Sequence, residues 1–182
     1  DWFEGKALEK VLAAFIYDDI MQQAHTETYI DLYEEFKQNY PESPYLSVLE
    51  PGMEETIRFH KTELDESLYP LIPYDSTMTT LKDAWKSLKG KVVYVDVWAT
   101  WCGPCKEMFQ YVPAFKEKAK DLEVAYLYLS IDRPQAEKVW KKSIPYYNLK
   151  GHHLLAGKEL AQAVYQELGN ERGILSIPRF LI

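Results

Sequence analysis

The first third of the chain has apolar residues at the spacing of amphipathic helices. Over residues 4–24, apolar side chains recur at intervals of three and four, as on one face of an α-helix: Leu8, Val11, Leu12, Phe15 and Ile16. The same criterion predicts a second helix from about Glu27, with these residues on one side: Ile30, Tyr33 and Phe36. A third, short helix is predicted to follow Glu50-Pro51-Gly52 and to run through Ile57 and Phe59.

Prolines limit these predicted helices. The stretch YPESPY ends the second helix, because neither Pro41 nor Pro44 can donate a helical hydrogen bond. The stretch LYPLIPYDS, residues 68–76, has the composition of a linker. The sequence therefore predicts a helical N-terminal region over residues 1–74 and a second domain over residues 75–182.

From Ser76 onward the pattern predicts strands that alternate with helices. Two unbroken runs of β-branched and aromatic residues, VVYVDVWA (92–99) and VAYLYLSID (124–132), predict buried strands. The stretch GILSIPRFLI (173–182) predicts a strand entered through a proline, and GHHLLAG (151–157) predicts a short extended piece or a loop.

Helical patterns separate these strands. Thr80 and Asp83 form a capping-box pattern at the start of a helix that stops at Gly90. Further helices are predicted over three ranges, the first of them kinked at Pro113: residues 106–122, 134–143 and 158–169. This alternation predicts an α/β fold with helices on both faces of a sheet.

Composition and charge exclude several classes of protein. Of the 182 residues, 47% are hydrophobic and 14% are aromatic, which is enough for a packed core. The net charge is −7 and no basic run is present, so a nucleic-acid partner is not expected. No apolar run approaches the roughly 20 residues that span a bilayer, and no signal peptide is visible. Because the chain begins with Asp1 rather than Met, we expect a processed or excised chain without its targeting segment.

The only two cysteines lie three positions apart in the stretch WCGPCKEM, which follows the predicted strand ending in WAT. This order places Cys102 at a helix N-terminus, where free N–H groups and the helix dipole stabilise a thiolate. We therefore expect Cys102 to be the solvent-facing nucleophile of low pKa. Cys105 is expected to point inward and to attack a mixed disulfide formed by Cys102, releasing the reduced partner.

Three further features of the sequence surround this pair. Asp96 lies within an apolar strand, where burial raises the pKa of a carboxyl, so it could accept the proton of Cys105; alternatively, it caps a loop or faces water at an edge. Pro178 follows Ile in the stretch SIPRF, and X-Pro bonds can be cis. A loop facing the cysteines would offer its backbone to an extended substrate, although spacing alone does not place it there. Trp98 and Trp101 are expected to pack around the turn and exclude water from its inner side.

These motifs resemble a known superfamily. DVWATWCGPCK (Asp96–Lys106) resembles the active-site sequence of the thioredoxin superfamily, and SIPRF (176–180) resembles its cis-proline loop. WATWCGPCKEM, and the roughly 40 residues between Asp132 and Gly173, more closely resemble the TlpA/ResA-like thiol-disulfide oxidoreductases. The N-terminal helical region is similar to that of Bacteroidetes-type members. The resemblance implies a mixed sheet flanked by helices, with a helical insert before the cis-proline strand.

The resemblance also implies roles for individual residues. Cys102 matches the nucleophile, Cys105 the resolving cysteine and Asp96 the buried acid/base. Residues implied to contact the substrate are Trp101, Gly103, Pro104, Ile177 and the cis-proline, Pro178. The redox-active disulfide Cys102–Cys105 would serve without a cofactor or a metal.

The implied partners are protein dithiols and disulfides, such as those of cytochrome c maturation or other envelope proteins, together with an upstream thiol donor. The implied location is the periplasm or cell envelope. The CGPC sequence resembles that of reducing thioredoxins, so a reductant is expected rather than an oxidant.

Two positions depart from the superfamily pattern. A lysine usually lies near the buried aspartate, but here the corresponding position is Tyr128, whose phenol can donate a hydrogen bond but offers no cation. The thioredoxin fold also continues with another strand and a helix, whereas this chain ends at Ile182. We therefore expect a truncated sheet whose unpaired edge permits self-association.

Other functions remain open from the sequence. One is a peroxiredoxin-like thiol peroxidase, since Thr100 precedes Cys102 by two residues, although its resolving partner would usually be distant. Another is a non-catalytic binding module in which His152, His153 and the cysteines hold structural zinc; ordinary surface histidines are the expected alternative. A third is a recognition surface formed by tyrosines of the N-terminal helices, which could instead pack within the helical layer: Tyr29, Tyr33, Tyr40 and Tyr45.

Overall fold

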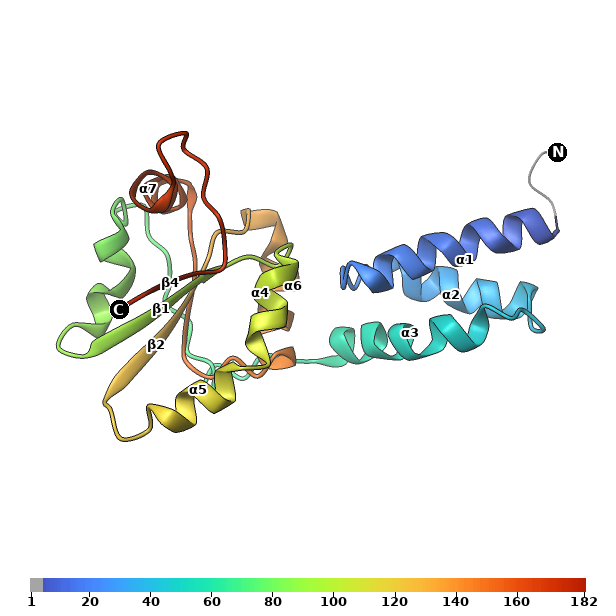
Figure 1. Cartoon of the computed structure of the whole chain (residues 1–182), viewed down its shortest axis with the longest axis horizontal. Helices are drawn as coiled ribbons and strands as arrows, with labels where there is room; N and C mark the ends of the chain where they lie inside the picture. The colour runs from blue at the N-terminus through green and yellow to red at the C-terminus, as the bar shows by residue number, and fades with distance from the viewer. Residues whose placement is uncertain (1–4) are drawn as a thin grey trace. The chain divides into compact units, whose positions relative to one another are not determined.

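The computed structural model describes residues 5–182, which form two compact units that meet between Thr62 and Glu63 (Figure 1). The predicted boundary after residue 74 therefore lies within the second unit. The Ile72 N–H donates to the His153 carbonyl at 2.7 Å, and the His153 N–H donates to the Pro70 carbonyl at 2.9 Å. Prolines prevent a helix in this stretch but leave its extended backbone able to pair with a strand.

From residue 5 onward, the first unit consists of three helices: α1 (Lys6–Met21), α2 (Thr28–Asn39) and α3 (Leu46–Lys61). The predicted start of the first helix at residue 4 lies outside the described residues. The apolar faces of the three helices enclose one small core: Ala13, Ile16, Tyr33, Phe36, Leu49 and Met53. Of the four tyrosines considered above, Tyr33 is buried in this core, and the others pack partly buried against it.

The third helix begins earlier than predicted. It starts at Leu46 and contains Pro51, whereas the prediction had it start after Gly52. Pro51 removes one helical hydrogen bond, but Leu49 and Met53 on either side of it are at most 1% exposed. Burying two large apolar side chains outweighs the loss of one hydrogen bond.

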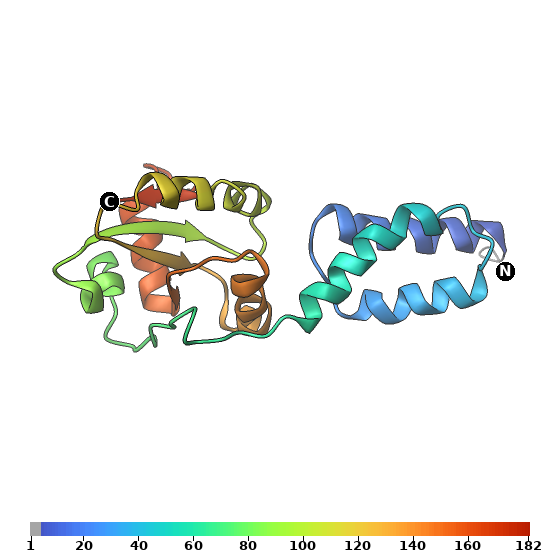
Figure 2. The ribbon, with the colours of Figure 1, turned by 90° about the horizontal axis from the view of Figure 1, so that it is seen from below.

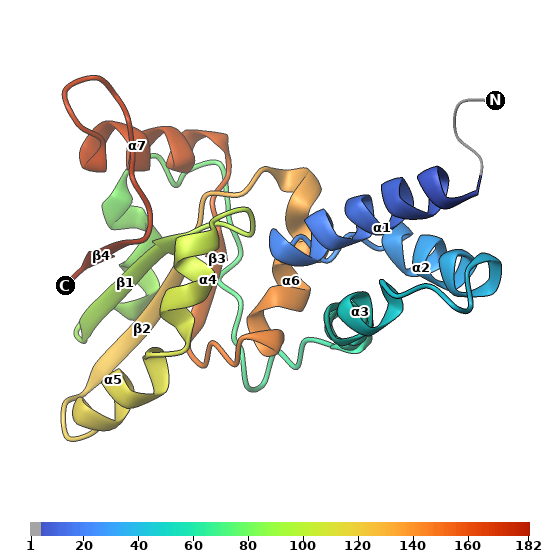
Figure 3. The same cartoon turned by 45° about the vertical axis from the view of Figure 1, so that its right-hand side comes forward.

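The second unit is built on a four-stranded mixed sheet in the order β3-β2-β1-β4. The strands β1 (Val92–Trp98), β2 (Val124–Ser130) and β3 (His152–Leu155) are parallel (Figure 3), and β4 (Arg179–Leu181) is antiparallel to β1. The two central strands β1 and β2 are rich in large apolar residues, as a sheet covered on both faces requires, whereas β3 begins with two histidines. The predicted α/β fold with a mixed sheet is confirmed.

Helices cover both faces of this sheet (Figure 2). On one face lie α4 (Gly103–Phe109) and α5 (Val112–Lys118), and on the other lie the 3₁₀ helix η1 (Leu81–Leu88) and α7 (Lys158–Leu168). The short η2 (Pro134–Ala136) leads into α6 (Glu137–Tyr146), whose Trp140 and Ile144 are buried in the core. The insert before the cis-proline strand is therefore helical, as predicted.

Two predicted elements differ in detail. The helix with an expected kink at Pro113 is two helices, since α4 ends at Phe109 and Pro113 lies in the first turn of α5, where its missing N–H costs nothing. Only the end of the stretch 173–182 forms a strand, because Asn170 holds the preceding residues in a turn: its side chain accepts from the Ile174 N–H at 3.0 Å. Among the described residues, no helix combines the length and apolar character needed to cross a membrane.

Candidate functional site

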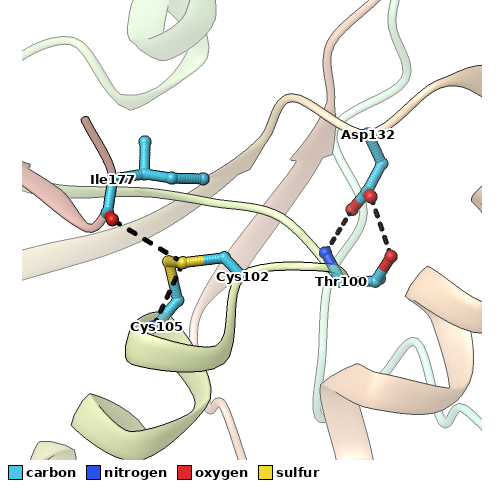
Figure 4. Close-up of a disulfide and its surroundings, with 5 residues drawn as sticks. All are labelled: Thr100, Cys102, Cys105, Asp132 and Ile177. Carbon is cyan, nitrogen blue, oxygen red and sulfur yellow. Dashed lines mark hydrogen bonds between the residues drawn. A yellow bond between two sulfur atoms is a disulfide. The ribbon is translucent and has the colours of Figure 1, made fainter. Parts of the chain in front are cut away.

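A disulfide joins Cys102 and Cys105 at the start of α4, with their Cα atoms 5.3 Å apart (Figure 4). Cys102 is the N-cap of this helix, and its Sγ accepts a hydrogen bond from the Cys105 N–H at 3.1 Å. Pro104 lies in the first turn, where a helix does not need its N–H. The predicted strand-to-helix turn is therefore present, and it places one sulfur at the exposed-amide end of the helix.

The two cysteines differ in burial less than predicted. Cys105 is 0% exposed and points inward, as expected, but Cys102 is only 4% exposed rather than solvent-facing. The reason is the loop at Ile177, whose carbonyl oxygen lies 3.7 Å from the Sγ of Cys102 (Figure 4). In the disulfide form, Cys102 has no proton to donate, so the Sγ and the Ile177 oxygen are only in contact. When Cys102 is reduced, its thiol proton could be donated to this oxygen.

The loop that faces Cys102 is the one containing Pro178. The peptide bond between Ile177 and Pro178 is cis, and the next residue begins β4, which pairs with β1 through Val97 and Arg179. Because β1 leads directly to the cysteines, this pairing brings residues far apart in the sequence to the same end of the sheet. The sequence could identify Pro178, but only this strand pairing places its loop beside Cys102.

Asp96 lies on the face of β1 that packs against α4 and α5. Side chains alternate along a strand, so Asp96 shares its face with Tyr94, which contacts α5 through Phe115, and with Trp98, which contacts α4 through Phe109. Asp96 is 2% exposed, and its Oδ1 has no hydrogen-bond partner among the described residues. Burial raises the pKa of its carboxyl to about 7.

Tyr128, which stands where the superfamily usually has a lysine, lies directly beside Asp96, because the two residues are in register across β1 and β2. A cation does reach this face of the sheet, but from α5: the Nζ of Lys116 lies 4.3 Å from the centre of the Tyr126 ring and 5.4 Å from that of Tyr128. Burial lowers the pKa of Lys116 to about 8 and raises the pKa of Tyr128. The phenol thus occupies the position next to the carboxyl, with an ammonium beyond it.

Asp132, which the sequence analysis did not single out, anchors the segment before Cys102. It is 3% exposed, and its carboxylate accepts hydrogen bonds from the Thr100 N–H and the Thr100 hydroxyl, each at 2.8 Å (Figure 4). The available signal was a charged residue at the end of a buried strand, where an unpaired carboxylate would be costly. Its partner could not be read from the sequence, since it lies 32 positions away.

A comparison with family models matches residues 72–182 to Redoxin. The chain belongs to the Redoxin family. The match spans the whole sheet, the CGPC turn and the cis-proline loop, and together with the similarity to ResA given next it confirms the predicted thioredoxin-superfamily resemblance of TlpA/ResA type.

Individual relatives of this Redoxin chain carry related names. It is 33% identical over 69 residues to the thiol-disulfide oxidoreductase ResA of Bacillus cereus, an overlap of 36% of each chain, so it spans about a third of that relative's length. It is 38% identical over 69 residues to an H-type thioredoxin of Oryza sativa, covering 38% of this chain and 49% of that one. A crystal structure of the thioredoxin domain of a thiol-disulfide oxidoreductase from Bacteroides vulgatus is 26% identical, with a TM-score of 0.42 over 55% of this chain and 64% of that one.

The tryptophans of the Redoxin domain behave differently from each other. Trp98 is fully buried, as predicted, but Trp101 is 61% exposed and does not shield the inner side of the turn. Trp98 belongs to β1 and faces α4, whereas Trp101 follows the end of the strand and leaves most of its side chain exposed to solvent. Trp101 also lines an open hollow of about 580 Å³, together with Thr100, Arg133 and Tyr165.

The structure bears on the alternative chemistries as well. The Thr100 hydroxyl, which a peroxidase would aim at its reactive sulfur, donates to Asp132 instead. His153, expected at the surface, is 0% exposed: its Nε2 lies 2.7 Å from the Leu149 carbonyl oxygen, and its ring stacks on Tyr128. Within residues 5–182, no three His, Cys, Asp or Glu side chains gather as a metal site would require.

Proposed function

We propose that this chain is a thiol-disulfide oxidoreductase that exchanges its Cys102–Cys105 pair with disulfides of other proteins. The observation that carries the proposal is the disulfide at the N-terminus of α4, with one sulfur facing the Ile177 carbonyl and the other fully buried. Redoxin membership and the similarity to proteins named as thiol-disulfide oxidoreductases support it.

The reaction proceeds in two exchanges. The Cys102 thiolate attacks one sulfur of the substrate disulfide, forming a mixed disulfide and releasing the other substrate sulfur as a thiolate. Cys105 then attacks the Sγ of Cys102, closing the disulfide and releasing the second substrate sulfur. Two electrons pass from the dithiol to the substrate, and each substrate thiolate takes up a proton.

Asp96 is proposed as the acid/base for the second exchange. Cys105 belongs to α4, which packs on the face of β1 that carries Asp96, so both groups lie in the layer between sheet and helix. With a pKa of about 7, the carboxyl is partly ionised at neutral pH and can accept the Cys105 proton as that thiol attacks. It returns the proton when the disulfide is reduced again.

Substrate contact is proposed for the residues around the sulfurs. The Ile177 carbonyl lies at Cys102 next to the cis-Pro178 bond, and Gly103 and Pro104 form the turn between the cysteines. Apart from its chain neighbours and the backbone of its own helix, no heavy atom of residues 5–182 lies within 4 Å of where a Cβ would stand on Gly103, so a substrate backbone can approach there. The Ile177 carbonyl can accept a hydrogen bond from the N–H of an extended substrate segment.

The proposed partners are extracytoplasmic proteins, including cytochrome c maturation or other envelope proteins, with an upstream thiol donor that reduces the pair. Fractionation of the native cells tests this location, and a cytoplasmic pool alone would contradict it.

A further proposed partner is a second copy of the chain. Among the described residues, β4 is an edge strand that pairs with β1 on one side only, and an unpaired edge can pair with another chain. Light scattering that gives the monomer mass at every concentration would contradict self-association.

A redox titration tests the proposed function. The protein is equilibrated with glutathione buffers of graded composition and its free thiols are counted by alkylation and mass spectrometry. We expect both thiols to disappear together in a single two-electron step, and the reduced protein to reduce one protein disulfide per chain. Independent titration of the two cysteines, or no transfer to a protein disulfide, would contradict the proposal.

Replacing Trp101 with alanine is predicted to weaken substrate contact without affecting the fold. Because Trp101 is 61% exposed, the free energy of unfolding should change by less than about 0.5 kcal/mol. We expect kcat/KM for a protein disulfide to fall about tenfold, since a large aromatic contact next to the reacting sulfur is lost. The rate with oxidised glutathione should change less than about twofold. Tyr111→Ala is the matched control, since Tyr111 is 59% exposed on the linker between α4 and α5; equal losses in both variants would contradict the role.

A further inference from the structure

We propose that Asp132 is a positioning residue that fixes the approach to Cys102 and thereby favours closure of the Cys102–Cys105 disulfide. The inference rests on the dithiol-disulfide cycle proposed above. It concerns a carboxylate outside that cycle, on the loop after β2, that touches neither sulfur in the structure.

The contacts of Asp132 form a two-point clamp on a single residue. One carboxylate oxygen, Oδ2, accepts from the Thr100 N–H at 2.8 Å and from the Ser130 hydroxyl at 2.7 Å, and Oδ1 accepts from the Thr100 hydroxyl at 2.8 Å. The Ser130 oxygen in turn accepts from the Asp132 N–H at 3.1 Å. Backbone and side chain of Thr100 are therefore held by the same group (Figure 4).

This arrangement favours a carboxylate. A buried carboxylate is costly unless its oxygens accept hydrogen bonds, and here three donors supply them while water is largely excluded. An asparagine of the same shape could keep one acceptor oxygen for the Thr100 N–H and the Ser130 hydroxyl, but its NH₂ group would meet the Thr100 hydroxyl, which would have to change from donor to acceptor. The substitution therefore keeps the volume of the side chain but loses the charge that strengthens all three hydrogen bonds.

The clamp acts on Cys102 through a short and constrained path. Thr100 precedes Cys102 by two residues, and the Cys102 N–H donates to the Ala99 carbonyl at 3.0 Å, closing a turn between the strand and α4. One end of this turn is held by β1, and Asp132 holds its middle. Cys102 therefore has little freedom to move away from Cys105, which is itself fixed within α4.

Restricting this motion favours disulfide closure. Two thiols held in bonding geometry react as if each were present at high effective concentration, and this advantage falls when one of them gains freedom. Removing the clamp should therefore lower the equilibrium constant for disulfide formation against glutathione. The unconstrained chain would be the stronger oxidant and the weaker reductant.

The test measures this equilibrium constant in five proteins by the alkylation titration described above. We expect the constant to fall about tenfold in Asp132→Asn, which corresponds to a potential about 30 mV less negative. Thr100→Val removes one of the two attachments and should lower it about threefold, whereas Thr100→Ser keeps the hydroxyl and should stay within about twofold of wild type. If Asp132→Asn does not fold, the two Thr100 variants decide the question.

Asp83→Asn is the matched control. The Asp83 carboxylate also accepts from a threonine N–H and hydroxyl, those of Thr80, each at 2.8 Å, but at the start of η1 rather than before the cysteines. It should lower the urea midpoint of unfolding and leave the redox equilibrium unchanged. Variants of Asp132 and Thr100 that lose stability yet keep the wild-type constant would overturn the inference. A wild-type protein that fails to exchange with glutathione would instead overturn the proposed function.

Discussion

Replacing Cys105 with serine is expected to turn the protein into a trap that accumulates mixed disulfides on Cys102. The first exchange needs only Cys102, but the second needs the buried sulfur of Cys105, which lies in bonding contact with Cys102 in the structure. Without it, the intermediate can be resolved only by an external thiol, which is slower than attack by a positioned neighbour. The adducts are measured by non-reducing electrophoresis and mass spectrometry after incubation with an envelope extract, and the trapped chains identify the substrates.

Cys102→Ser is the matched control for this experiment. It keeps Cys105, but that residue is 0% exposed and lies within α4, whereas Cys102 lies at the helix start beside the substrate-facing loop at Ile177. We expect no adducts from Cys102→Ser and a loss of disulfide reduction of about a thousandfold or more, because the nucleophile supplies the entire covalent step. Adducts that form on Cys105 in Cys102→Ser, and not on Cys102 in Cys105→Ser, would reverse the assignment of attacking and resolving sulfurs.

Asp96→Asn is expected to stabilise the oxidised protein at pH 8 by about 4 kcal/mol and to slow catalysis. The carboxyl has an ordinary pKa of 3.8, which burial raises to about 7 in the folded protein. Between these values the unfolded chain releases the proton while the folded chain keeps it, so stability falls as the pH rises from about 4 to about 7 and is level above. At about 1.36 kcal/mol per pKa unit, the whole fall is about 4 kcal/mol, and a neutral asparagine avoids it.

Urea unfolding of the oxidised wild type and of Asp96→Asn between pH 4 and pH 9 measures this difference. The control is Asp83→Asn: hydrogen bonds from Thr80 lower the pKa of Asp83, so its contribution to stability is lost as the pH falls, the opposite direction. The proposed acid/base role adds a kinetic expectation, since the pH dependence of disulfide closure near 7 should disappear in Asp96→Asn. Equal stability of wild type and variant at pH 8 would show that Asp96 is ionised without cost.

The candidate reacting groups could be predicted because each one has a local signature. Two cysteines one helical turn apart behind a strand, with a proline between them, predict a pair of thiols at a helix start, and the structure joins them there in a disulfide. An aspartate inside an unbroken apolar strand indicates a buried carboxyl, and the structure places Asp96 at 2% exposure. These predictions depend on residues within a few positions of one another.

The surroundings of those groups could not be predicted in the same way. The burial of Cys102 depends on Ile177, 75 positions away, and the clamp on Thr100 depends on Asp132, 32 positions away. His153 was expected at the surface as an ordinary histidine of the insert, but pairing of β3 with β2 stacks its ring on Tyr128. Sequence periodicity reports which residues share a face and not which distant element covers that face.

By itself, the sequence determined the local features: two cysteines at a helix start, a buried aspartate on the preceding strand and a proline loop, within an alternating α/β pattern. Only the tertiary structure decided how deeply Cys102 is buried and which residues hold the chain before it. Strand pairing brings the loop before β4 and the loop after β2 to the same end of β1, where one contacts the sulfur and the other holds the chain leading to it. Those contacts join segments that are far apart along the chain, so no local sequence pattern marks them. Closing such long loops costs entropy, and burial of the whole sheet, rather than the contacts themselves, offsets that cost.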